Sequence, residues 1–185
     1  MTEYDDLCQA WFEEEPRRIA IDRVLRQLPL NMKEAISAHL APPMGHAVMP
    51  TKLYNAQTAY VELYWPVLDV SGKRTWERCG ADNCLRPDNQ GIYTFHIGIC
   101  IEKTRGSLNA SMIYFTFTVE AFDDRFVELQ IKNLDGLIRI DNVNDPASYR
   151  NAAKLAIDRL IADLRNPTTE RWSRVPLGFT FAGNS

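Results

Sequence analysis

The segments GIYTFHIGICIEK (residues 91–103) and SMIYFTFTVEA (residues 111–121) decide the fold of this chain. Both are rich in aromatic and β-branched residues, and in both of them large apolar side chains occupy every second position. A period of two residues is typical of β-strands, whose successive side chains point to opposite faces of a sheet. We therefore predict two long strands joined by the loop at residues 104–109.

Weaker strand patterns surround this pair, at residues 60–70, 73–79, 125–131 and 137–141. Residues 60–70 (YVELYWPVLDV) and 73–79 (KRTWERC) predict a hairpin with a two-residue turn at Ser71 and Gly72, because glycine accepts the positive φ of a tight turn. Consecutive hairpins predict an antiparallel meander of five to six strands.

Helical patterns lie at both ends of the chain. Residues 145–166 carry an unbroken apolar stripe after an N-cap at Asp145 and a proline in the first turn, which predicts a long helix packed on the sheet. Residues 1–40 also show helical spacing, but Pro16 and Pro29 predict separate helices there, the last one starting at Asn31. The fold class predicted is α+β.

The chain is long enough for one domain that needs no metal or disulfide to fold. We expect the single domain 1–185 to comprise a helical part at 1–40, a connector at 41–59, the sheet at 60–141, the helix at 145–166 and a tail at 167–185. The tail is apolar, so we expect it to dock on the fold or on a partner.

Charge and composition narrow the classes of function. Net charge is −3 and no segment is a basic block, so nucleic acid is an unlikely partner. The acidic N-terminus does not resemble a signal peptide, and no apolar run predicts a membrane span. We expect a cytoplasmic protein without membrane contact, whose four cysteines are reduced thiols.

Sorting strand residues by parity gives two faces. One face is predicted to be the core and collects Val61, Leu63, Trp65, Val67, Trp76, Tyr93, Phe95, Ile97, Ile99, Ile101, Ile113, Phe115, Phe117 and Val119. The second face collects Tyr60, Glu62, Tyr64, Thr75, Glu77, Thr94, His96, Gly98, Cys100, Tyr114, Thr116, Thr118 and Glu120. An antiparallel sheet commonly exposes one such face to water.

The second face also has features of a recognition surface. Tyrosine combines apolar area with a polar tip and is enriched at interfaces, and Gly98 leaves space for a ligand or another backbone. The residues we select as ligand-binding or partner-binding are Tyr60, Glu62, Tyr64, His96, Tyr114, Thr116 and Glu120. If the N-terminal helices fold back over this face, it becomes the floor of a pocket.

A metal site is the first chemical hypothesis to test. Cys79 and Cys84 followed by His96 and Cys100 resemble a four-ligand zinc module. Residues four apart on a strand are about 13 Å apart, so His96 and Cys100 cannot bind one ion. Cys79 and Cys84 with His46 or Asp82 remain an alternative, opposed by the many turn formers of this loop. We assign no metal and no cofactor.

The function predicted is that of a non-enzymatic adaptor or regulatory protein, which contacts a protein partner or a second copy of itself through the second face and the tail. A small-ligand sensor with a pocket between sheet and helices is one alternative. Another is a hydrolase-type enzyme in which Glu62, Glu77 or Glu120 orients His96 as a general base. None of the common catalytic motifs is present, so we assign no catalytic residue.

Overall fold

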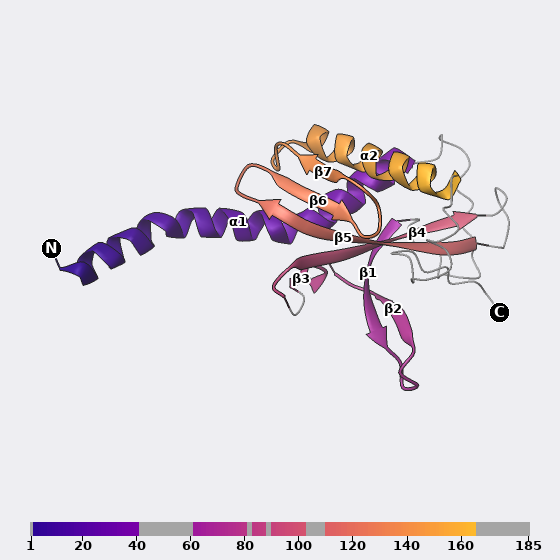
Figure 1. Ribbon diagram of the computed structural model, residues 1–185, viewed down its shortest axis with the longest axis horizontal. Coiled ribbons are helices and arrows are strands. Elements are labelled where there is room, and N and C mark those ends of the chain that lie inside the picture. Colours follow the sequence, from indigo (N-terminus) through magenta and orange to yellow (C-terminus); the bar gives the residue numbers. More distant parts are fainter. Residues whose placement is uncertain (1, 41–60, 81–82, 88–89, 103–109, 166–185) are drawn as a thin grey trace.

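A computed structural model describes residues 2–40, 61–80, 83–87, 90–102 and 110–165. The predicted connector at 41–59 and tail at 167–185 lie outside these ranges. Two helices, α1 (Glu3–Leu40) and α2 (Pro146–Arg165), accompany one antiparallel sheet, which confirms the α+β prediction (Figure 1). The strands are β1 (Val61–Leu68), β2 (Arg74–Arg78), β3 (Arg86–Pro87), β4 (Tyr93–Glu102), β5 (Ala110–Phe122), β6 (Val127–Ile131) and β7 (Leu137–Ile140).

The order of the strands in the sheet is β2-β1-β4-β5-β6-β7, with the short β3 paired to β4. The chain runs as a meander from β4 to β7. The hairpin of β1 and β2 joins the meander through β1, which pairs with β2 on one edge and with β4 on the other. The chain therefore crosses β1 on its way from β2 to β4. The pairing of β4 with β5 is the longest ladder, running from Thr94↔Thr118 to Glu102↔Ala110.

The main core lies between one face of this ladder and the two helices. Phe95, Ile97, Phe115 and Phe117 are fully buried on that face, and the rings of Phe95 and Phe117 stack with centroids 4.9 Å apart. The buried stripe of α2 includes three alanines, which allow the helix to approach its neighbours closely. The prediction that the C-terminal helix covers the core is confirmed.

Helix α2 is also held at its first turn and at the sheet edge. The carboxylate of Asp145 accepts a hydrogen bond from the backbone N–H of Ala147 at 2.9 Å, as an N-cap does. The Arg159 guanidinium donates to the carbonyl oxygens of Gly136 at 2.6 Å and Leu137 at 2.9 Å. Arg159 therefore satisfies carbonyl groups at the start of the edge strand β7.

Helix α1 is continuous, so the prediction of separate helices was wrong. It contains both Pro16 and Pro29. A proline inside a helix costs about 3 kcal/mol relative to alanine. Around Pro29 the helix buries Leu25, Leu28 and Met32, and each fully buried apolar side chain returns about 1.5–3 kcal/mol. Tertiary packing thus outweighs the local cost at Pro29.

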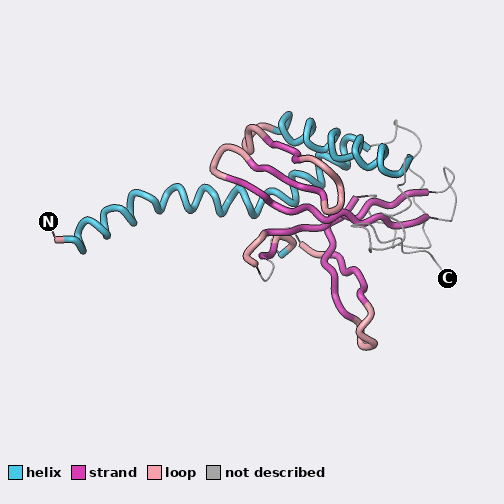
Figure 2. The backbone as a smooth tube through the Cα atoms, in the orientation of Figure 1, coloured by secondary structure: helices cyan, strands magenta, loops and turns pink. Residues whose placement is uncertain are grey.

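The N-terminal half of α1 has a different environment. It extends away from the other described elements, and in Figure 2 no strand or second helix of the described residues runs beside it. We call residues 3–19 the arm. Pro16 lies in the arm and is exposed, so burial does not offset its cost there.

The hairpin of β1 and β2 has a register that differs from the predicted one. A two-residue turn at Ser71 and Gly72 would place Trp76 opposite Val67, but Trp76 lies opposite Pro66. The loop is one residue longer than predicted, because the backbone N–H of Asp69 bonds to the carbonyl of Lys73 at 2.9 Å. A shift of one residue moves every side chain of a strand to the other face.

Side chains around the loop explain its length. The Asp69 carboxylate accepts hydrogen bonds from the backbone N–H groups of Ser71 at 2.8 Å and Lys73 at 2.9 Å, and from the Ser71 hydroxyl at 2.6 Å. These bonds lower the pKa of Asp69, that of the Ser71 hydroxyl contributing most. Gly72 supplies the positive φ, +78°, that closes the loop.

Among the residues that the structure describes, neither α1 nor α2 has a stretch that is both long enough and apolar enough to cross a bilayer.

We predict that Pro16→Ala stabilises the helix of the arm. Alanine restores a backbone N–H and removes the clash with the preceding turn, a gain of about 3 kcal/mol at an exposed position. Amide hydrogen exchange in residues 12–20 should become slower by one order of magnitude or more. Arg17→Ala serves as the control and should change exchange little. Equal exchange in wild type and Pro16→Ala would show that the arm does not open locally at the proline.

Candidate functional site

The structure brings together most of the selected second-face residues. Tyr64 pairs with His96 across β1 and β4, and His96 pairs with Thr116 across β4 and β5. Glu62 and Tyr114 lie on either side of Gly98 in the next row. Tyr60 lies outside the described residues.

His96 occupies the centre of this group. It is 7% exposed, and its Nδ1 lies 2.9 Å from the hydroxyl oxygen of Thr116. The rings of Trp65 and Trp76 approach it with centroid distances of 5.3 and 5.2 Å and interplanar angles of 69° and 66°. Edge-to-face contacts of this kind are favourable between aromatic rings.

The two tryptophans were assigned to the core by parity, and that assignment was wrong. The indole of Trp76 stacks on the ring of Tyr114 with centroids 4.4 Å apart and planes 9° from parallel. Tyr64 meets Tyr114 edge-on at 5.0 Å. The register described above brings Trp76 to the side of Tyr64, and it also moves Thr75 and Glu77 of β2 off the face predicted for them.

Trp65 reaches His96 because β1 leaves β4 at this point. The last registered pair between the two strands is Tyr64↔His96, after which β1 continues only with β2. Figure 1 shows the hairpin projecting on the side of the sheet opposite to α2. The Arg86 guanidinium lies 4.6 Å from the centre of the Trp65 ring, a cation–π distance. We call Tyr64, Trp65, Trp76, His96 and Tyr114 the aromatic cluster.

The aromatic cluster is a packed second core and not an open surface. Tyr64 and Tyr114 are 4% and 5% exposed. The sequence left open whether N-terminal helices cover this face. In the structure α1 packs in the main core beside α2, and the hairpin tryptophans contact His96 instead. Among the described residues, the buried Nε1 of Trp76 has no hydrogen-bond partner. A buried donor without a partner costs about 1–3 kcal/mol.

The two selected carboxylates have different positions. Glu62 forms an ion pair with Arg78 at 2.7 Å, and Lys33 of α1 lies 4.0 Å from it. Glu120 is exposed at a register shift between β5 and β6. At ~3.3 Å per residue it lies about 13 Å along the strand from Thr116, so it does not join the group around His96.

The cysteines of the loop after β2 are oxidised. Cys79 and Cys84 form a disulfide with Cα atoms 5.8 Å apart, within the usual range for such bonds. The prediction of reduced thiols was wrong for this pair. The bond also removes both sulfurs as ligands of the alternative metal site, and the wholly buried Cys84 side chain belongs to the main core.

Two further surfaces lie on α1. The arm exposes Tyr4, Leu7, Trp11, Phe12 and Ile19, which we call the arm stripe and which are between 55% and 72% exposed. Tyr4, Leu7, Trp11 and Phe12 of this stripe follow the spacing of an amphipathic helix in the sequence. Near the other end of α1, a groove of about 260 Å³ separates this helix from the start of α2.

The chain matches no model of a protein family, no curated protein and no solved structure.

We predict that Trp76→Phe lowers the free energy of unfolding by less than the loss of side-chain volume alone suggests. Phenylalanine keeps a ring for the stack on Tyr114 and removes the unpartnered N–H, so its cost should stay within about 1 kcal/mol. Trp76→Ala, the comparison variant, should cost about 2–4 kcal/mol because it removes the cover of the cluster. Urea unfolding measures both values. Equal destabilisation by the two variants would contradict the account of the buried N–H.

Proposed function

We propose that this chain is a non-enzymatic adaptor or regulatory protein that binds another protein through the arm stripe, and that the partner is a second copy of the chain. The observation that carries the proposal is the exposure of five large apolar side chains on one projecting helix. Contiguous exposed apolar patches commonly mark protein interaction sites.

The helix of the arm would be more stable if another surface packed against it. Isolated helices shorter than about 12–15 residues are marginal in water, and helices in proteins gain most of their stability from packing an apolar face. The arm is only slightly longer than this limit and carries the cost of Pro16. Burial of the stripe against another surface would offset that cost.

The stripe provides enough area for a stable contact. An aromatic side chain buries about 150–250 Å² when fully covered. Covering the five mostly exposed stripe residues in each of two copies would remove on the order of 1,000 Å² from water. This is about the lower limit for a specific interface, so we expect a dimer of moderate affinity.

The charges of α1 favour a second copy in the antiparallel orientation. Residues 3–15 carry six acids and no base, whereas residues 17–26 carry four arginines and one aspartate. In a parallel pair every acid would lie beside its own copy. In an antiparallel pair centred between residues 13 and 14, residues 3–6 lie beside residues 21–24 of the second copy, which carry both Asp22 and Arg23. Otherwise only the central acids at 13–15 still lie beside acids of the second copy, so less of the acidic segment is repelled than in a parallel pair.

The other functional hypotheses have weaker support. The centre of the second face is filled by the aromatic cluster, which leaves little surface for a partner or a ligand there. The Glu62 carboxylate is engaged with Arg78 and Glu120 is distant, which disfavours His96 as a base oriented by either residue. A cytoplasmic location stays a prediction, and the Cys79–Cys84 disulfide counts against it because such bonds seldom persist in that compartment.

We predict that the chain is a dimer and that Trp11→Asp weakens it. A charge at the centre of the stripe removes a large apolar contact, and loss of a central aromatic residue typically costs 2 kcal/mol or more, about 30-fold in Kd. Light scattering coupled to size exclusion over a concentration series measures the change. Ala10→Asp adds the same charge outside the stripe and should leave the dimer intact.

The outcome that contradicts self-association is a wild-type monomer up to about 100 μM, a concentration at which a contact of this area is expected to be populated. Equal weakening by Trp11→Asp and Ala10→Asp would contradict the stripe as the interface.

We further predict that Ile19→Cys forms a disulfide with Cys8 of the second copy under mild oxidation. An antiparallel pair centred between residues 13 and 14 brings these positions to the same level, and both lie on the apolar side of the arm. Ala20→Cys, which points elsewhere, is the control. Peptide mapping by mass spectrometry identifies the bond. A bond between two copies of Cys8 in the wild-type chain would instead indicate parallel pairing.

A further inference from the structure

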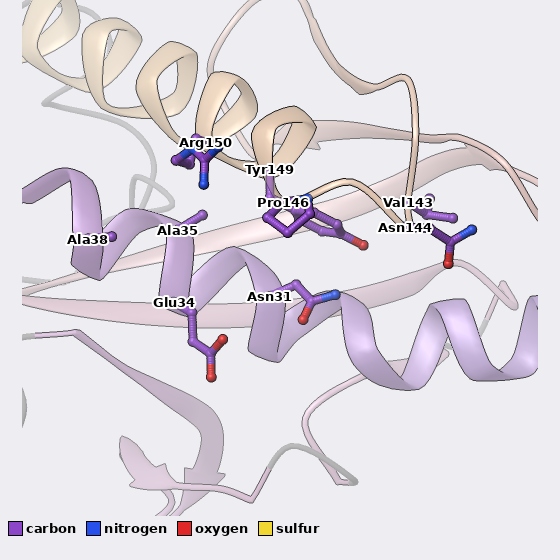
Figure 3. A pocket seen from close by; sticks show the side chains of 9 residues that line it. All are labelled: Asn31, Glu34, Ala35, Ala38, Val143, Asn144, Pro146, Tyr149 and Arg150. Atoms are coloured by element: carbon purple, nitrogen blue, oxygen red, sulfur yellow. The ribbon is translucent and has the colours of Figure 1, made fainter.

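The groove between α1 and α2 has an apolar floor and polar ends. Ala35, Val143, Pro146 and the ring of Tyr149 contribute its apolar lining (Figure 3). Burial raises the pKa of Tyr149, and a hydrogen bond with Asn31 opposes this effect. Because Tyr149 is 4% exposed and fixed in this way, the floor is preformed.

Arg150 provides the positive end of the groove. Its side chain extends from α2 over Ala35 of α1, as Figure 3 shows, and it is exposed. No ion pair or hydrogen bond of its guanidinium is found within the described ranges of the chain. The neighbouring N–H of Ala147 already donates to Asp145, and Arg150 is the cationic donor among the residues that line the groove.

The remaining polar groups do not oppose an anion at Arg150. In Figure 3 the Glu34 carboxylate turns away from α2, although its residue lines the groove. Asn31 and Asn144 lie on the far side of Pro146 and Tyr149 from Arg150. Their amides give the second end of the groove a neutral, hydrogen-bonding character.

We propose that this groove binds a small monocarboxylate with an apolar body, such as an aryl or branched aliphatic acid. The carboxylate pairs with Arg150, a planar donor suited to bidentate contact, while the apolar body covers the Tyr149 ring and Ala35. Drug-sized ligands occupy pockets of roughly 300–1,000 Å³, so a groove of about 260 Å³ selects a smaller molecule. This site does not depend on self-association through the arm.

Phenylacetate is a suitable probe, and phenylacetamide is its neutral counterpart of the same shape. Titration of each into the full-length ¹⁵N-labelled chain, followed by amide chemical shifts, measures both location and affinity. We expect phenylacetate to shift amides in residues 31–38 and 143–150 with a Kd of about 0.1–1 mM, as ligand efficiency allows for so few atoms. Phenylacetamide should bind at least about tenfold more weakly.

Two variants of α2 test the role of the charge. Arg150→Gln should weaken phenylacetate binding by about tenfold or more, the usual effect of losing a charge-assisted hydrogen bond. Lys154→Gln removes the same charge one turn along the helix, outside the groove, and should leave the affinity within about twofold. Ala38→Leu narrows the groove from the α1 side and should weaken both probes.

The proposal is overturned if phenylacetate at 5 mM shifts no groove amide, or if acid and amide bind equally well. Equal weakening by Arg150→Gln and Lys154→Gln would also overturn it, because binding would then follow net charge and not the guanidinium at this site. Native dispersion of the amide spectra confirms in each case that the variant is folded.

Discussion

The ladder between β4 and β5 is the constraint on which the rest of the structure depends, because both of its faces are buried at its centre. Phe95 and Phe117 on one face pack under the two helices, while on the other face His96 belongs to the aromatic cluster and its Nδ1 lies beside the Thr116 hydroxyl. An antiparallel sheet often leaves one face to water. Here the hairpin of β1 and β2 covers it, and this explains why aromatic residues occur at both parities of these strands.

The sequence predicted the long strands and α2 well because their signals are local. Alternation in residues 91–103 and 111–121 identifies β4 and β5 without knowledge of their neighbours, and the Asp145 cap with the following proline locates the start of α2. The same parity placed Tyr64, His96 and Thr116 on one face correctly. Parity alone does not set the register, and the structure shows that these three residues also share a row, Tyr64↔His96 and His96↔Thr116.

The tryptophans could not be placed from parity alone. Their position depends on the number of residues in one loop, and a difference of one residue reverses the face of β2. Asp69 explains the extra residue, since its carboxylate accepts hydrogen bonds from the backbone N–H groups of Ser71 and Lys73 and so favours the longer loop. Trp65 also requires the divergence of β1 from β4, which is a property of the assembled sheet and not of the strand sequence.

Helix α1 shows why the helix propensity of single residues predicts a helix poorly when its two halves have different environments. Pro29 is tolerated where Leu28 and Met32 enter the core, whereas Pro16 has no comparable burial in the arm. The same division separates the two proposed surfaces. The arm stripe needs a second molecule to be buried, while the groove is already shaped by packing of α1 against α2 around Tyr149. Loss of self-association would therefore leave the groove intact, and an empty groove would not affect the arm.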